Sequence, residues 1–203
     1  LPIIDTLNHL IASGDRVNNI QAVLSGSLNF VFNSFDDNTT FREVVERAMQ
    51  EGYTEPDPKI DLSGIDVARK ILILARESGY VLELSDIENK PFLPQACLDT
   101  KTNDDFLQCL DAHESHFASL YAAAKKENAR LKYVATFENG KASVGLQQIP
   151  EGHDFYNLEG SDNIVLFYTD RYAQQPLIVK GAGAGAAVTA SGIFADIIRI
   201  GKS

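Results

Sequence analysis

The order of predicted elements in this 203-residue chain indicates an α+β fold with a largely antiparallel or mixed β-sheet. Helical and strand patterns follow one another irregularly, without the regular strand–helix alternation of a parallel α/β protein. The dipeptide Asn139-Gly140 is a strong hairpin signal between two stretches of alternating apolar residues. Hydrophobic residues make up 44% of the chain, which is enough for a packed core, and we treat residues 1–203 as one domain.

The first half of the chain contains one predicted strand among helices. Residues 2–13 place their apolar side chains on one helical face and stop at Gly14. Residues 16–24 form a predicted strand, and a tight turn at 25–27 leads into a helix over 28–35. Thr40 and Glu43 form a capping box for a third helix, which Gly52 closes. Ser63 is the predicted N-cap of a fourth helix, which ends at Gly79.

The second half of the chain contains most of the predicted strands. The sequence after Gly79 is irregular as far as residue 93, and Thr102 then caps a single long helix that reaches about residue 128. Four strands are predicted at residues 130–138, 141–149, 163–169 and 176–180. A glycine-rich run over 181–187 leads into a last helix at 188–200.

Composition and charge limit the classes of partner. A formal net charge of −10 argues against binding to nucleic acid or to anionic membranes. No segment approaches the roughly 20 apolar residues of a membrane span. The opening residues Leu1-Pro2-Ile3-Ile4 contain no basic region, so we expect no signal peptide there. Because the chain lacks an initiator Met and opens inside a helical pattern, we expect it to be a fragment of a longer protein.

The two cysteines are Cys97 and Cys109, twelve residues apart and without a CxxC motif. We expect neither a disulfide framework nor a zinc site from this spacing, as is typical of a protein in the reducing cytosol. The prediction for the cellular location is therefore cytoplasmic.

The most informative stretch of the sequence is residues 52–70, which holds four carboxylates and two lysines between Glu55 and Lys70. Prolines on both sides of Asp57 hold Glu55 and Asp57 in a stiff, non-helical segment. Asp66 and Lys70 are four residues apart and share one helical face. One interpretation is a solvated loop with an ordinary surface ion pair. The other is a binding site, in which a carboxylate holds a substrate ammonium group and the lysine exchanges a proton with a substrate oxygen.

Two small-residue segments are further candidates. Residues 25–29, Ser-Gly-Ser-Leu-Asn, combine hydroxyls with free N–H groups at a helix start, which suits a small anionic ligand or simply a turn and cap. The motif Gly181-x-Gly183-x-x-Ala186 follows a strand, but too few residues remain for a complete dinucleotide-binding unit. This run either approaches a phosphate or cofactor edge, or only packs a helix on the sheet.

Other motifs are weak. His113-Glu114-Ser115-His116 is one residue short of the zincin pattern, and we interpret it as a solvated helix face. The segment Asp57-x-Lys59-x-Asp61 lacks a ligand and the glycine of a calcium-binding loop. No P-loop or nucleophile elbow is present, and no residue of this chain is predicted to bind a metal.

Residues 52–70, with the run Gly-Tyr-Thr-Glu-Pro-Asp-Pro and the later Asp-Val-Ala-Arg-Lys, closely resemble the signature of the homoserine dehydrogenase family. Residues 25–30 resemble the family's Ser-Gly-Thr-Leu-Asn/Ser-Tyr turn, with Ser27 and Phe30 as conservative departures. The glycine-rich segment through Val188-Thr189-Ala190 resembles the family's closing segment. These three matches keep the family's order, and the middle of the chain is most similar to the dehydrogenase half of the bacterial bifunctional aspartokinase–homoserine dehydrogenases.

The resemblance implies reversible, NADP- or NAD-dependent reduction of aspartate 4-semialdehyde to L-homoserine, on the route to threonine and methionine. By the family pattern, Glu55 binds the substrate amino group with Asp61 and Ser27 nearby. Asp66 holds substrate and positions Lys70, and Lys70 exchanges the proton of the substrate oxygen. Gly183 and Gly185, together with Gly26, are implied to lie against the cofactor.

The resemblance also implies what lies outside this chain and how it assembles. The family's Rossmann domain, a second active-site lysine and the metal-binding loop all precede the segment that matches here. The fold implied is similar to the substrate domain of glyceraldehyde-3-phosphate dehydrogenase-like enzymes, with helices on one face of the sheet, and it pairs two subunits as a homodimer. The alternative hypothesis is a non-catalytic dimerisation or small-ligand-binding module of the same fold.

Overall fold

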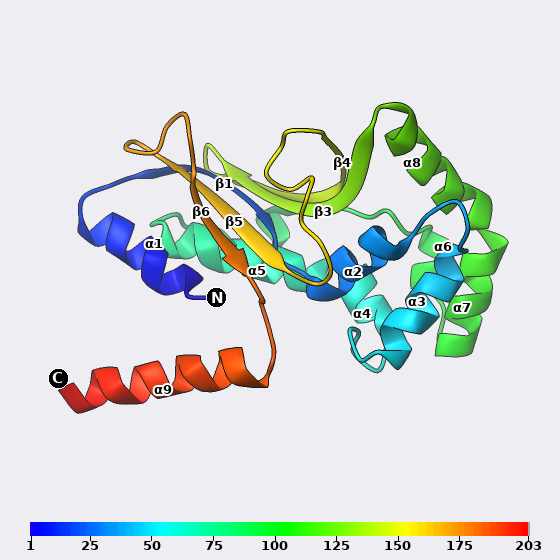
Figure 1. The fold of residues 1–203 in the computed structure, drawn as a ribbon, viewed down its shortest axis with the longest axis horizontal. Coiled ribbons are helices and arrows are strands. Elements are labelled where there is room, and N and C mark those ends of the chain that lie inside the picture. The colour runs from blue at the N-terminus through cyan, green and yellow to red at the C-terminus, as the bar shows by residue number, and fades with distance from the viewer. Residues whose placement is uncertain (203) are drawn as a thin grey trace.

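The structure is a computed structural model that describes residues 1–202. Its centre is one six-stranded sheet with the strand order β2-β4-β3-β1-β5-β6 (Figure 1). Only the pair β2–β4 is parallel among the paired strands described, and the other pairs are antiparallel. The predicted α+β class with a mixed sheet is confirmed. The strands are β1 Val17–Val23, β2 Ile87–Lys90, β3 Ala129–Glu138, β4 Lys141–Pro150, β5 Asn163–Thr169 and β6 Leu177–Gly181.

Helices cover one face of this sheet. Alternate side chains of the strands, such as Ile20, Tyr133 and Phe137, point into the main core, where they meet the buried faces of the helices. The helices are α1 Ile3–Ala12, α2 Gly26–Ser34, α3 Phe41–Gln50, α4 Pro58–Leu62, α5 Ile65–Glu77, α6 Gln95–Leu98, α7 Asn103–Ala112, α8 Glu114–Lys126 and α9 Ala186–Lys202, with a 3₁₀ turn η1 at Leu84–Asp86.

The opposite face of the sheet is covered in part by the chain between β4 and β5. Phe155 and Leu158 from this connection form a second, smaller apolar cluster with Val23, Val134 and Leu166. The connection has no helix or strand of its own, and its residues 158–162 run back towards the start of α2. This connection therefore links one face of the sheet to α2.

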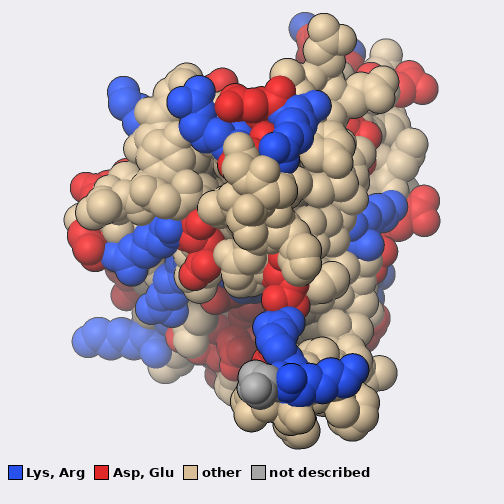
Figure 2. All heavy atoms as spheres, turned by 90° about the vertical axis from the view of Figure 1, so that its left-hand side faces the viewer, with Lys and Arg blue, Asp and Glu red and all other residues tan. Residues whose placement is uncertain are grey.

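The last helix, α9, stands apart from the rest of the molecule (Figure 1). None of its described residues is buried, and an ion pair from Arg199 Nη2 to Asp5 Oδ2 of α1, 3.0 Å long, links it to the body. Its exposed apolar side chains include Ile193, Phe194 and Ile197. On the face drawn in Figure 2, basic and acidic side chains are interspersed, and further acidic groups are visible in the hollow between the body and α9. Within residues 1–202, no helix is long and apolar enough to cross a membrane.

Several local predictions are confirmed. The Thr40–Glu43 capping box starts α3, with both reciprocal hydrogen bonds formed. Asn139 and Gly140 form the turn between β3 and β4, whose register begins at Glu138↔Lys141. The prediction of Ser63 as a helix N-cap is wrong. Asp57 instead caps α4 through its bond to the Lys59 N–H, Ser63 ends that short helix, and α5 begins after Gly64.

Gly64 allows this change of direction for two reasons. Its φ of +75° is a conformation that favours glycine, and a Cβ at this position would collide with the Tyr133 hydroxyl. The chain therefore makes a sharp corner between α4 and α5, and α4 packs against both α5 and α2. The sequence pattern alone did not show this corner because Ser63 is also a common N-cap residue.

The region around the cysteines differs from its prediction. The predicted long helix over 102–128 is two helices, α7 and α8, which meet at His113, and the stretch predicted to be irregular holds η1 and β2. Cys97 of α6 and Cys109 of α7 form a disulfide, so the expectation of unpaired cysteines is wrong. The interpretation of His113 and His116 as a solvated helix face is also wrong. Both are half-buried, with His113 Nδ1 bonded to Cys109 O and His116 Nε2 to Phe92 O.

Candidate active site

A cavity of about 540 Å³ opens where the start of α2, the loop before α4, the first turns of α5 and the glycine-rich run meet. Every residue that the sequence singled out for substrate, cofactor or proton transfer borders this cavity. The set comprises Gly26, Ser27, Glu55, Asp61, Asp66, Lys70, Gly183 and Gly185. Its charged members are three carboxylates and one lysine, so the cavity favours a cationic group such as an ammonium.

The Lys70 ammonium is held at two points. Its Nζ lies 2.7 Å from Asp66 Oδ2, one helical turn earlier in α5, and donates a 3.0 Å hydrogen bond to the carbonyl of Leu24 at the end of β1. The two side chains are 44% and 50% exposed, so a substrate can reach them. The opposite side of α5 packs into the core through Val67, Ala68 and Ile71, which fixes the helix that presents the pair.

A second group of polar residues joins the stretch 52–70 to α2. The Ser27 hydroxyl donates to Asp61 Oδ1 at 2.9 Å, and the backbone N–H of Glu55 donates to the other oxygen, Asp61 Oδ2, at 2.8 Å. Ser25 caps α2 by accepting from the N–H of Leu28, and its hydroxyl lies 2.9 Å from that of Ser27. Asp61 therefore fixes the loop that carries Glu55, and both of its oxygens are already engaged.

The Glu55 carboxylate is different from that of Asp61. It is exposed at the cavity edge, and no described residue forms a hydrogen bond or an ion pair with it. Its backbone is held by Asp61, and Pro56 follows it, so the free carboxylate is attached to a restrained segment. This arrangement leaves an acceptor available for a ligand's positive group.

The glycine-rich run forms one wall of the cavity, and local packing or backbone conformation explains why glycine occupies Gly183 and Gly185. A Cβ on Gly183 would collide with the Asn163 side chain, and Gly185 has a φ of +125°, which other residues rarely adopt. At Gly26 a Cβ would lie 3.0 Å from the carbonyl oxygen of Ser161. Packing therefore accounts for Gly26 and Gly183, and the same tight packing lets the backbone border the cavity.

Two further wall residues, Ser161 and Asn163, were not found from the sequence. Asn163 opens β5, and its Nδ2 donates a 3.1 Å bond to the carbonyl of Val23 on the neighbouring strand. These residues lie far in sequence from the motifs at 25–30 and 52–70. No local pattern marks them, because the contacts that bring them to the cavity are made across the sheet.

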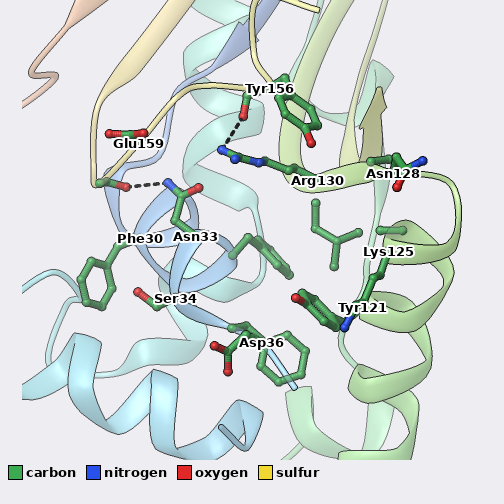
Figure 3. Close-up of a pocket in the computed structure, with 16 residues that line it drawn as sticks. Phe30, Asn33, Ser34, Asp36, Tyr121, Lys125, Asn128, Arg130, Tyr156 and Glu159 are labelled. Atoms are coloured by element: carbon green, nitrogen blue, oxygen red, sulfur yellow. Dashed lines mark hydrogen bonds between the residues drawn. The ribbon is translucent and has the colours of Figure 1, made fainter. Parts of the chain in front are cut away.

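A second, larger cavity of about 630 Å³ lies between α2, α8 and the start of β3 (Figure 3). Its labelled charged residues are largely engaged: Arg130 donates to the Tyr156 carbonyl and lies over its ring, while Lys125 pairs with Asp37. Asp36 accepts from the backbone N–H of Asn38. None of the candidate site residues borders it, so this cavity is separate from the candidate active site.

Comparison with known proteins identifies the relatives of this chain. The family model described as homoserine dehydrogenase matches residues 2–198. A chloroplastic bifunctional aspartokinase/homoserine dehydrogenase 2 from Zea mays is 46% identical over 202 residues, covering 98% of this chain and 22% of the relative. A homoserine dehydrogenase from Schizosaccharomyces pombe is 43% identical over 208 residues, covering 98% of this chain and 55% of the relative. The chain thus spans less than two thirds of either relative.

A solved structure is also similar over the whole chain. A protein of unknown function from Candida auris has a TM-score of 0.92 and 41% identity, covering 100% of this chain and 58% of that one. The family resemblance of the three sequence motifs is therefore confirmed over the full length of the chain. Bifunctional and single-function relatives are about equally similar to it.

Proposed function

Because this chain belongs to the homoserine dehydrogenase family, we propose that it supplies the substrate-binding and proton-transferring part of a homoserine dehydrogenase. The reaction is the nicotinamide-dependent interconversion of L-homoserine and L-aspartate 4-semialdehyde. The observation that carries the proposal is a single cavity that brings together the free Glu55 carboxylate and the Asp66–Lys70 pair. An amino acid with a nearby hydroxyl or aldehyde presents the two groups that such a cavity would bind.

Glu55 is the proposed partner of the substrate ammonium group. Its carboxylate faces the cavity without a partner among the described residues, and a charge-assisted hydrogen bond to an ammonium is stronger than one between neutral groups. Asp61 and Ser27 support it by fixing the loop, and both residues border the same cavity. The three carboxylates of the cavity add to its preference for a cation.

Lys70 is the proposed acid and base at the substrate oxygen. Reduction of the aldehyde delivers a hydride to carbon and a proton to oxygen, and the Lys70 ammonium is the proton donor in the cavity. In the reverse direction the neutral amine accepts the hydroxyl proton. Asp66 and the Leu24 carbonyl fix the direction of Nζ and leave one of its three N–H positions for substrate.

The nicotinamide cofactor, NADP or NAD, supplies or accepts the hydride when it is bound. Gly26, Gly183 and Gly185 are the proposed residues beside it, because their backbone borders the cavity without side chains in between. Most of the cofactor is proposed to be bound by a Rossmann domain outside this chain. The 203-residue chain alone is therefore expected to have no measurable turnover of homoserine.

We further propose that the family's homodimer forms through this domain. The cytoplasmic location stays a prediction, and the Cys97–Cys109 disulfide removes the cysteine argument on which it was based. Light scattering on the full-length protein tests the assembly, and a monomer at high concentration would contradict it. Fractionation of cells that express the full-length protein tests the location.

The function is tested by assaying the full-length protein that contains this chain with homoserine and either nicotinamide cofactor. Wild-type protein is expected to form reduced cofactor, and Glu55→Gln is expected to raise the KM for homoserine at least about tenfold because one charge-assisted bond is weakened. Lys141→Met, at an exposed position of β4 outside the cavity, is the control. Absence of turnover in the wild type would favour the non-catalytic module.

A further inference from the structure

Lys132 on β3 is a lysine whose side chain is completely buried, with an exposed fraction of 0%. Its Nζ donates three hydrogen bonds, to Asn29 Oδ1 at 3.0 Å, Asn33 Oδ1 at 2.6 Å and the Leu158 carbonyl at 2.5 Å. An ammonium has three N–H groups, so every one has an acceptor. All three acceptors are neutral, and burial lowers the pKa of Lys132 to about 8.

The lysine determines which way the two asparagine amides point. An ammonium only donates, so each amide must turn its oxygen towards Lys132 and its NH₂ group away. The NH₂ of Asn29 donates to the carbonyls of Gly160 and Asp162, both at 3.1 Å. That of Asn33 donates to the carbonyls of Leu158 and Gly160, both at 3.0 Å, and Figure 3 shows Asn33 turned towards the segment beside Glu159.

These bonds fasten residues 158–162 to α2, and we call Lys132, Asn29 and Asn33 the amide clamp. The clamped segment contains Ser161 and continues directly into Asn163, and both residues border the candidate active site. The Ser161 carbonyl lies against Gly26 at the start of α2. Asn163 in turn packs against Gly183, so the position of the glycine-rich run also depends on it.

We propose that Lys132 is a positioning residue that sets the Ser161–Asn163 wall of the substrate cavity by orienting the amides of Asn29 and Asn33. Its kinetic consequence rests on the proposed dehydrogenase function. Lys132 does not border the cavity, and Lys70 is held by Leu24 and Asp66 without the clamp. Loss of the clamp therefore changes substrate binding more than proton transfer.

The test compares Lys132→Met with wild type in the full-length protein, using Lys141→Met, at an exposed position of the neighbouring strand β4, as the matched control. Methionine keeps the length of the side chain but cannot donate. We expect the KM for homoserine to rise about tenfold, as when one substrate contact is misplaced, while kcat changes less than about threefold. Backbone hydrogen exchange over residues 158–162 is expected to accelerate in Lys132→Met and not in Lys141→Met.

A second variant tests the same proposal if Lys132→Met fails to fold. Asn33→Ala changes an exposed residue that does not border the candidate site, yet it removes two bonds to the clamped segment, so it is expected to raise KM in the same direction by a smaller factor. Unchanged exchange over 158–162 in both variants would overturn the proposal. Faster exchange with an unchanged KM would mean that the clamp has only a structural role, which would also overturn the proposal. A wild type without turnover would refute the proposed function. The hydrogen-exchange rates over residues 158–162 would still test whether Lys132 fixes this segment, because they do not depend on enzyme activity.

Discussion

Two lysines of this chain are held in opposite ways. Lys70 is 44% exposed, pairs with a carboxylate and lies at the mouth of a cavity. Lys132 is fully buried, and its three acceptors are all neutral groups. An accessible lysine with a charged partner can meet a substrate, whereas a buried one with every N–H engaged can only hold protein groups in place. Lys70 is therefore accessible to a ligand, whereas Lys132 contacts only the protein groups around it.

The largest expected effect concerns the exposed lysine. Lys70→Ala removes the only lysine that borders the described cavity, and turnover of homoserine by the full-length protein is expected to fall by about 10²–10⁴-fold, the usual contribution of a general acid–base group. The expected melting temperature is close to that of wild type, because the side chain is 44% exposed and an ion pair so open to solvent contributes little stability. Steady-state assays and thermal unfolding measure the two quantities. An unchanged rate would mean that Lys70 is only a surface ion pair.

The two lysines also differ in what the sequence could predict. Asp66 is one helical turn from Lys70, so the pair followed from spacing, and the family motif then predicted its role. The partners of Lys132 are 26, 99 and 103 residues away, so no local pattern marks it. The same distinction holds for the fold. The Thr40 capping box and the Asn139-Gly140 hairpin are local and were predicted, whereas the corner at Gly64 depends on Tyr133 and was not.

The next effect is on stability and concerns the buried lysine. Lys132→Met leaves the amide oxygens of Asn29 and Asn33 without their donor and removes one of the two donors to the Leu158 carbonyl, so the free energy of unfolding is expected to fall by about 1–3 kcal/mol. Lys141→Met, at an exposed position next to the hairpin turn, is expected to change it by less than about 0.5 kcal/mol. The variants are compared by denaturant unfolding and, in a separate experiment, by hydrogen exchange in β3. An equal loss in the free energy of unfolding in both variants would mean that the hydrogen bonds of Lys132 add no stability of their own.

A pH dependence sharpens the same comparison. The pKa of Lys132 is about 8 in the folded chain against an ordinary 10.5, chiefly through burial, with Arg130 and Lys180 lowering it further and Glu159 raising it. Between these values the unfolded chain binds more protons than the folded one, so the free energy of unfolding contributed by Lys132 increases as the pH rises from 8 to 10.5. Below pH 8 both states are protonated and this contribution is constant.

The measurement is the melting temperature of wild type minus that of Lys132→Met at several pH values. This difference is expected to increase above pH 8, since only the wild type carries the titrating group. A difference that stays constant or decreases over that range would show that the three hydrogen bonds keep Lys132 protonated in the folded chain.

The smallest expected effect is on stability at the exposed pair. Asp66→Asn removes the charge that faces Lys70, but an ion pair about half in solvent contributes no more than about 1 kcal/mol to the free energy of unfolding. The Leu24 carbonyl still accepts from Nζ, so the lysine keeps one of its two anchors. A loss of turnover with almost no loss of stability, measured on the same full-length preparation, would separate a site from an ordinary surface ion pair. A loss of several kcal/mol instead would mean that the pair supports the fold, and the contrast between the two lysines would then fail.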